Sequence, residues 1–317
     1  MTKKLITACI GAGNIGRAWA MMFARAGHEV RLFDQNADAP PAALALMRGL
    51  LADQKALGLF DDEVEAVLAR IKVAPSLEAA VKNADYVQEC VYEDLELKRR
   101  VFQALDRAAP EGAILASSVS SIPVSQFMEN LAGSRRCIGA HPINPPHLLP
   151  VTELIMSPST APATYERAAA FLTSVGQVPV RINKEIFGFA LNRLQFAIVN
   201  EALHLIEQGY ISATDVDNIM KFGLGRRWAI MGLFEAGHLN ANGGLRDYYT
   251  KFGETIRSLM QELVLTPNPL GPALVDEIAG ELEKTTPIDQ VVARQAWRDR
   301  QLAALMTHFE SMKTKVG

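Results

Sequence analysis

Cysteine is scarce in this sequence, whose 317 residues contain only Cys9, Cys90 and Cys137. The three lie far apart, each within an apolar stretch, so the sequence supports neither a disulfide framework nor a cysteine-rich zinc site. The six histidines also lack the spacing of metal ligands. We therefore expect no bound metal, and we expect the cysteines to be buried thiols in the reducing cytoplasm.

Two further absences exclude classes of partner. A net charge of −3 leaves no surplus of positive charge for a polyanion, which argues against nucleic acid and anionic membranes. No stretch approaches the roughly 18 consecutive apolar residues of a membrane-spanning helix. The basic start, Met1–Lys4, is not followed by the cleavage pattern of a signal peptide. These absences favour a soluble protein that acts on small molecules.

The length and the 49% hydrophobic content are enough for two domains. We expect an α/β domain over residues 1–185 and an all-helical domain over residues 186–317. In the first domain, short apolar runs alternate with longer helical patterns, which predicts a doubly wound, mostly parallel sheet. The expected strands are Leu5–Ile10, Val30–Phe33, Tyr86–Cys90, Ile114–Ser117, Cys137–Ala140, Glu153–Met156 and Val178–Ile182.

Two helical regions complete the outline. Between Ala42 and Arg70, apolar residues recur at helical spacing over more chain than one crossover needs, so we expect a helical arm that projects from the sheet. After residue 186 the strand patterns disappear. The apolar pattern from Phe189 to Ile206 predicts a long helix that ends at Gly209.

A glycine-rich turn, Gly11-Ala12-Gly13-Asn14-Ile15-Gly16, follows the first expected strand and opens a helix. This pattern between a strand and a helix is typical of Rossmann dinucleotide-binding domains. We expect Gly11 to form the tight turn, Gly13 to let the backbone approach a pyrophosphate, and Gly16 to let the helix pack close to the strand. The helix N-terminus at Asn14 and Ile15 would then receive the negative charge.

Asp34 stands at the end of the second expected strand, where a carboxylate can bind the two hydroxyls of the adenosine ribose. A carboxylate there repels a 2′-phosphate, and Gln35 and Asn36 supply no arginine to bind one. The sequence therefore favours NAD over NADP. The alternative is a structural glycine turn beside an aspartate that caps a helix.

The segment His141-Pro142-Ile143-Asn144-Pro145-Pro146 follows the expected strand at Cys137–Ala140. A His-x-x-Asn segment at this place in a Rossmann domain resembles the 3-hydroxyacyl-CoA dehydrogenase family. Ser120, Glu153 and Asn192 match that family's other active-site positions, and the resemblance covers nearly the whole chain.

Several segments look closer still to the branch of that family that contains L-gulonate 3-dehydrogenase and lambda-crystallin. By that resemblance, Glu93 and Lys98 would also contact the cofactor. The segments are Gln88 to Lys98, His141 to Pro146, Asn192 to Gln195, Gly223 to Arg227, and His238 to Ala241.

The resemblance assigns each of these residues a chemical task. Oxidation of a secondary alcohol needs a base for the hydroxyl proton, and the imidazole of His141 can exchange protons near neutral pH. Glu153 would orient that ring and stabilise its charged form. Ser120 and Asn192 would bond the substrate oxygen, and Asn144 would also contact the substrate. His141 could instead be structural, and Ser120 could cap a helix ahead of Pro123.

Two departures from the acyl-CoA enzymes bear on the substrate. The helical arm turns acidic at Asp61, Asp62, Glu63 and Glu65, which suits a CoA phosphate poorly. Gly225-Arg226-Arg227 also stands where the acyl-CoA branch favours glycine and proline. A guanidinium pairs well with a free carboxylate, so we expect Arg227 to bind the substrate in an interdomain cleft. The alternative is that both arginines are only solvated in a loop.

Three hypotheses follow from the resemblance. The first is an NAD-dependent dehydrogenase of a small L-3-hydroxy acid such as L-gulonate, working as a homodimer. The second is a dehydrogenase of 3-hydroxyacyl-CoA, such as 3-hydroxybutyryl-CoA. The third is a crystallin-like structural protein, which the intact set of Ser120, His141, Glu153 and Asn192 disfavours.

Overall fold

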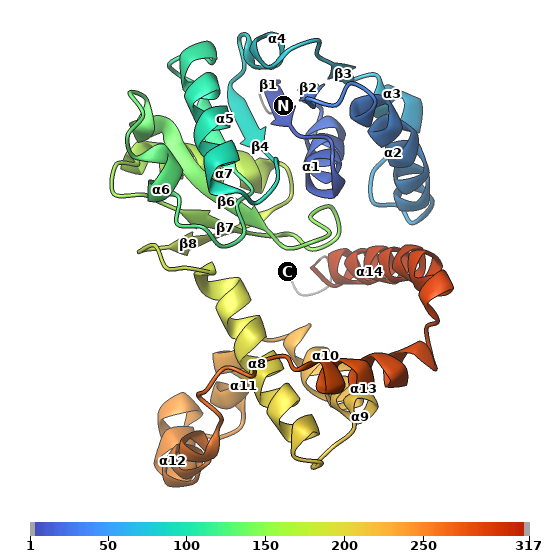
Figure 1. The fold of residues 1–317 in the computed structure, drawn as a ribbon, viewed down its shortest axis with the longest axis vertical. Coiled ribbons are helices and arrows are strands. Elements are labelled where there is room, and N and C mark those ends of the chain that lie inside the picture. The colour runs from blue at the N-terminus through green and yellow to red at the C-terminus, as the bar shows by residue number, and fades with distance from the viewer. Residues whose placement is uncertain (1–3, 314–317) are drawn as a thin grey trace. The chain divides into compact units, whose positions relative to one another are not determined.

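The computed structural model describes residues 4–313, which form two compact units (Figure 1). The first unit contains the chain up to Asn192 together with the residues from Gln295 onward, and the second contains Arg193–Arg294. This division differs from the expected boundary after residue 185, because the start of one helix and the end of the chain join the first unit. The domain boundary itself stays a prediction.

An eight-stranded sheet forms the centre of the first unit, in the order β3-β2-β1-β4-β5-β6-β7-β8. All neighbouring strands are parallel except β6 and β7, which pair antiparallel. The expected strands are all present, but the short β3 was missed and the antiparallel pair was not foreseen. The strands are β1 (Ile6–Ile10), β2 (Glu29–Phe33), β3 (Ile71–Val73), β4 (Tyr86–Glu89), β5 (Ile114–Ser117), β6 (Cys137–Pro142), β7 (Val151–Ile155) and β8 (Val178–Ile182).

Helices bury both faces of this sheet. Side chains alternate between the faces along each strand, so Cys9 packs in one apolar cluster and its neighbours Ala8 and Ile10 pack in the other. The first cluster includes α1 (Asn14–Arg25), α2 (Ala39–Ala56), α3 (Val64–Leu68) and α7 (Pro162–Ser174). The second includes α4 (Leu77–Val81), α5 (Leu95–Ala108) and α6 (Ser125–Met128), and the 3₁₀ turn η1 (Ser134–Arg136) precedes β6.

The segment expected to form a helical arm folds into α2 and α3. Helix α2 lies beside α1 (Figure 1), and its stripe of Ala43, Met47 and Leu51 is buried in the cluster that contains α1. Arg25 of α1 donates a hydrogen bond to the side-chain oxygen of Gln54 at 2.6 Å. Helical spacing thus predicted the helix correctly, but it could not show that the apolar stripe covers a neighbouring helix.

The second unit is entirely helical between Arg193 and Arg294. Its long first helix, α8, begins in the first unit and ends before Gly209, whose φ of 72° lies in the left-handed region. The helices are α8 (Phe189–Glu207), α9 (Ala213–Asn218), α10 (Gly225–Trp228), α11 (Leu233–Leu239), α12 (Gly244–Glu262) and α13 (Pro272–Glu283), with a π-helical turn η2 (Ile219–Leu224) and a 3₁₀ turn η3 (Ile288–Gln290). The last helix, α14 (Val291–Lys313), begins in the second unit and belongs to the first from Gln295 onward.

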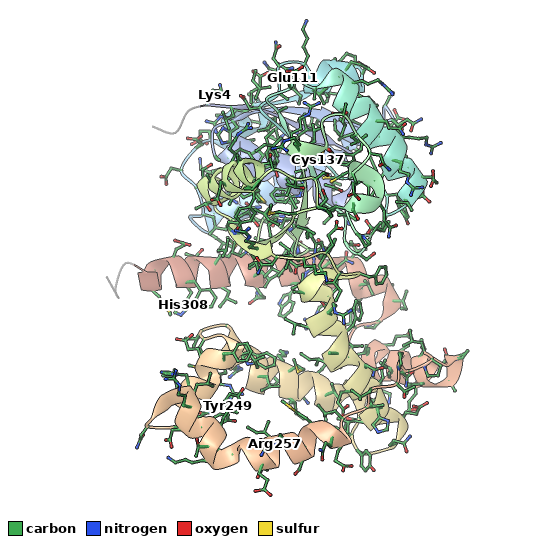
Figure 2. All side chains as sticks on the ribbon, turned by 90° about the vertical axis from the view of Figure 1, so that its left-hand side faces the viewer. Lys4, Glu111, Cys137, Tyr249, Arg257 and His308 are labelled. Carbon is green, nitrogen blue, oxygen red and sulfur yellow. The ribbon has the colours of Figure 1, made fainter. Side chains whose placement is uncertain are left out.

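The three cysteines are free thiols, as expected. Cys137 lies inside the first unit, whereas Tyr249 and Arg257 lie on α12 of the second (Figure 2). Burial raises the pKa of Cys137 to about 12, and burial raises that of the half-buried Cys90 to the same value. These thiols are therefore protonated at neutral pH.

No helix within residues 4–313 is long and apolar enough to cross a membrane.

Candidate active site

The glycine-rich turn joins β1 to α1 and is shaped by the lack of side chains at two positions. Gly11 has a φ of +107°, and a Cβ there would lie 2.6 Å from the carbonyl oxygen of Cys90. A Cβ on Gly16 would lie 1.8 Å from the carbonyl oxygen of Gly11. Gly16 thus lets α1 pack closely against the turn that directly follows β1. Both positions require glycine on steric grounds.

Gly13 differs from its neighbours, because a Cβ there would meet nothing within 4 Å. It precedes the first residue of α1, and no side chain caps that helix. The turn therefore presents an open glycine and the unsatisfied N–H groups of a helix N-terminus, including those at Asn14 and Ile15. This combination fits the diphosphate of a dinucleotide.

Asp34 follows β2 and is held beside the turn. Its Oδ2 accepts a hydrogen bond from the backbone N–H of Ala12 at 2.8 Å, and its Oδ1 accepts one from the N–H of Asn36 at 2.9 Å. A carboxylate offers about four acceptor positions, so these two bonds orient the group and leave lone pairs for ribose hydroxyls.

His141 and Glu153 face each other across the antiparallel pair of β6 and β7, where they occupy the same register position. Nδ1 of His141 lies 2.8 Å from Oε2 of Glu153, and the two residues are 6% and 3% exposed. The second oxygen of Glu153 accepts hydrogen bonds from the N–H groups of Ala190 and Leu191, each at 2.9 Å. The start of α8 thus stabilises a negative charge on Glu153.

This arrangement assigns different tasks to the two ring nitrogens of His141. Nδ1 is engaged with Glu153, which leaves Nε2 as the nitrogen that can exchange a proton with a bound substrate. The Phe189 ring, centred 5.6 Å from the imidazole, packs beside it. The pair therefore has the geometry of a base and its orienting carboxylate.

Ser120 and Asn192 are also brought together. The Nδ2 group of Asn192 donates a hydrogen bond to the backbone oxygen of Ser120 at 2.8 Å. The suggested cap role for Ser120 is wrong, since Val124 precedes α6 and no side chain caps that helix. Asn144 lies in the loop after β6 with an exposed side chain, so its contact with substrate stays a prediction.

The remaining expected site residues fall into two groups. Glu93 and Lys98 lie after β4 and within α5, where they bond protein groups, and their contact with cofactor stays a prediction. Arg227 lies on α10 of the second unit with an exposed side chain, and its role in substrate binding also stays a prediction. Sequence reasoning did not single out Glu89, although a strand that ends in two polar residues, Gln88 and Glu89, is a usable signal.

Comparisons with known proteins identify the family of this chain. Residues 6–186 match the NAD binding domain of 3-hydroxyacyl-CoA dehydrogenase, and residues 188–271 match its C-terminal domain. The chain is 41% identical over 302 residues to the lambda-crystallin homolog of Bos taurus, and the match covers 94% of each chain. It is 34% identical to an L-carnitine dehydrogenase of Streptomyces griseus, over 92% of this chain and 86% of that one.

A solved structure extends the likeness to three dimensions. The fold matches 5-formyl-3-hydroxy-2-methylpyridine 4-carboxylic acid 5-dehydrogenase, an NAD+ dependent dismutase, with a TM-score of 0.83 and 25% identity. The match covers 97% of this chain and 99% of that one, so both units have counterparts there.

Proposed function

Because the chain belongs to the 3-hydroxyacyl-CoA dehydrogenase family, whose first domain binds NAD, we propose that it oxidises the 3-hydroxyl of a small L-3-hydroxy acid with His141 as the base. The observation that supports this most directly is the buried pair of His141 and Glu153, with Ser120 and Asn192 joined by a hydrogen bond. L-Gulonate is the leading substrate.

The proton leaves the substrate hydroxyl for Nε2 of His141 as the C–O bond becomes a carbonyl. The imidazolium that forms donates a hydrogen bond from its Nδ1–H group to Glu153. The N–H groups of Ala190 and Leu191 stabilise the negative charge of Glu153. NAD, held at the glycine turn and by Asp34, would supply the acceptor for the hydride that leaves the carbon bearing this hydroxyl. Glu153 orients the ring and does not itself take the proton.

Ser120 and Asn192 contribute to the other side of the reaction. The hydrogen bond from Asn192 to the backbone oxygen of Ser120 fixes the position of this serine in the site. From there, the hydroxyl of Ser120 and the amide of Asn192 can bond the substrate oxygen as it changes from hydroxyl to carbonyl. Positioned polar groups of this kind lower the barrier most when they need no reorganisation.

The preference for a free carboxylate rests on relatives and on Arg227. Relatives include an L-carnitine dehydrogenase and a dehydrogenase named for a pyridine carboxylic acid, and both of these substrates carry a carboxylate. A bidentate arginine is the natural partner for such a group. An acyl-CoA, such as 3-hydroxybutyryl-CoA, is the alternative substrate, and a crystallin-like structural role is the alternative outside catalysis.

A substrate panel tests the proposal. NAD reduction would be measured with L-gulonate, L-3-hydroxybutyrate, L-carnitine and 3-hydroxybutyryl-CoA, with His141→Ala as the control for contaminating activity. We expect a free acid to give the highest kcat/KM. Better turnover of 3-hydroxybutyryl-CoA than of any free acid would contradict the substrate class, and no turnover of any compound would contradict the proposed reaction.

Arg227→Ala gives the substrate class a second test. It should raise KM for the best free acid about tenfold, which corresponds to roughly 1.4 kcal/mol, and leave thioester turnover unchanged. Arg226→Ala is the matched control, since the Arg226 guanidinium instead lies 4.8 Å from the centre of the Phe222 ring. Unchanged kinetics of Arg227→Ala on a free acid would remove this residue from the proposal.

We also propose that the protein works as a homodimer in the cytoplasm. The second unit exposes large apolar side chains such as Phe196, Phe234 and Leu265, and exposed apolar surface of this kind supports association with another subunit. Light scattering coupled to size exclusion would give the mass, and a monomer at micromolar concentration would contradict the dimer.

A further inference from the structure

A buried ion pair lies at the carboxyl ends of the central strands. Glu89 ends β4 and is fully buried, and the side chain of Lys98 near the start of α5 is 1% exposed. Nζ of Lys98 lies 3.0 Å from Oε1 and 3.1 Å from Oε2 of Glu89. Charges withdrawn from water cost several kcal/mol each unless partners satisfy them. The stability of this ion pair therefore depends strongly on how well its hydrogen bonds are formed.

Glu89 also reaches the loop of residues 118–122 through a serine. Oε1 of Glu89 accepts a hydrogen bond from the N–H of Val91 at 2.6 Å, and Oε2 accepts one from the hydroxyl of Ser117. The Ser117 oxygen in turn accepts the N–H of Val119 at 3.1 Å. Through Ser117, the carboxylate thus fixes the first part of the loop that carries Ser120.

Lys98 connects the same carboxylate to the rest of that loop. On its other side, Nζ lies 3.7 Å from Oε2 of Glu93. The opposite oxygen of Glu93 accepts the N–H groups of Ser120 at 3.0 Å, Ser121 at 2.9 Å and Ile122 at 3.4 Å.

The charge on Glu93 is stabilised in this position. Burial acts to raise the pKa of Glu93, but the Lys98 ammonium and the bonds from the loop N–H groups outweigh it, so the pKa lies below its ordinary value. Glu93 is therefore an anion that holds the loop while Lys98 holds Glu93.

We propose that Glu89 is a positioning residue of this active site, which sets the loop of Ser120 through Ser117 and through Lys98 and Glu93. The consequence for turnover rests on the proposed function, because that function gives Ser120 its task. The effect on the loop itself does not rest on the proposed function. Without the charge of Glu89, the Lys98 ammonium would draw Glu93 toward itself and away from the loop N–H groups.

Glu89→Gln tests this directly, because it keeps the size of the side chain and removes its charge. We expect at least tenfold faster hydrogen–deuterium exchange at the amides of Ser120, Ser121 and Ile122, and at least a tenfold lower kcat. Asp106→Asn is the matched control, since Asp106 pairs with Arg136 at 2.9 Å and both side chains are 11% exposed. Asp106→Asn should lower the free energy of unfolding, but it should change neither the exchange of the loop amides nor kcat.

Wild-type exchange at these amides together with wild-type kcat in Glu89→Gln would overturn the inference, whatever its loss of stability. If that variant does not fold, Ser117→Ala removes only the hydroxyl between Glu89 and Val119. In that case it should speed exchange at Val119, and unchanged exchange would overturn the inference. A wild type that oxidises no hydroxy acid would instead contradict the proposed function, because exchange is measured without substrate.

Discussion

The glycine turn and the pair of His141 and Glu153 are held in place by different means. At the turn, Gly11 and Gly16 fit because they have no side chain, and backbone atoms fill the space where a Cβ would lie. At the pair of His141 and Glu153, hydrogen bonds hold the carboxylate, because one oxygen faces the imidazole and the other accepts two backbone N–H groups. Substitutions at the turn should therefore act through backbone geometry, and those at the pair through protonation and charge.

Removing the proposed base, His141, should give the largest effect on turnover. His141→Ala should lower kcat by about 10² to 10⁴-fold, the range of general acid–base catalysis, while NADH binding stays within about twofold. Steady-state kinetics and NADH fluorescence titration would measure the two.

Glu153→Gln should lower kcat less, because the base itself remains. His204→Ala, on α8 in the second unit, is the control and should behave as wild type. If His141→Ala kept more than about a tenth of the wild-type turnover, another residue would have to be the base.

The turn can be divided by two alanine substitutions. Gly16→Ala places a Cβ against the Gly11 carbonyl, so the free energy of unfolding should fall by about 2–4 kcal/mol. Gly13→Ala meets no protein atom within 4 Å, so it should fold normally and weaken NAD binding about tenfold or more.

Urea unfolding and cofactor titration separate these outcomes. A Gly13→Ala protein with the wild-type affinity for NAD would show that the diphosphate lies elsewhere. The comparison also tests whether the open side of the turn is reserved for ligand rather than for packing.

Asp34 lies beside the glycine turn but, unlike the glycines, has a charged side chain. Asp34→Ala should weaken NAD binding about tenfold, roughly 1.4 kcal/mol, and narrow the preference over NADP because the repulsion of a 2′-phosphate is lost. Asp38→Ala nearby, at an exposed position, is the control. Equal turnover with NAD and NADP in the wild type would contradict the role of Asp34.

His147 is also a buried imidazole, but it has no hydrogen-bonded carboxylate among the described residues, whereas His141 has Glu153. It is 7% exposed, and no described residue bonds either ring nitrogen. Burial lowers its pKa to about 4, and the charges of Arg25, Arg17 and Arg298 act in the same direction while that of Asp299 opposes them.

In the unfolded chain the pKa of a histidine is about 6.5, so the unfolded state binds the proton first as the pH falls. The free energy of unfolding should therefore drop between about pH 6.5 and pH 4, by at most about 3 kcal/mol. His147→Leu should lose less stability over this window, whereas the exposed His308→Gln should follow the wild type. Parallel curves for His147→Leu and wild type would show that the pKa of His147 is the same in the folded and unfolded states.

The sequence predicted those parts of the fold whose signal is local. The glycine turn, the strand before it and Asp34 lie close along the chain, so their spacing was sufficient. The three-residue β3 was missed because so short a run has no clear alternation. The antiparallel pairing of β6 and β7 was missed because it depends on which strands become neighbours.

The same distinction applies to the site. His141, Glu153, Ser120 and Asn192 were found through a family resemblance, and the structure adds which of them bond each other. Glu89 was missed because its partners Lys98 and Ser117 come from α5 and β5, so only the fold brings these groups together.

The bonds from Ala190 and Leu191 to Glu153 limit how this protein can be divided. A truncated chain that ends at residue 185 would keep the glycine turn and Asp34 but lose both N–H donors of Glu153 and the side chain of Asn192. Such a fragment would retain the groups that hold the dinucleotide, while the imidazole would be left beside a poorly satisfied carboxylate. The shortest segment that carries all four proposed catalytic residues therefore includes the first turn of α8.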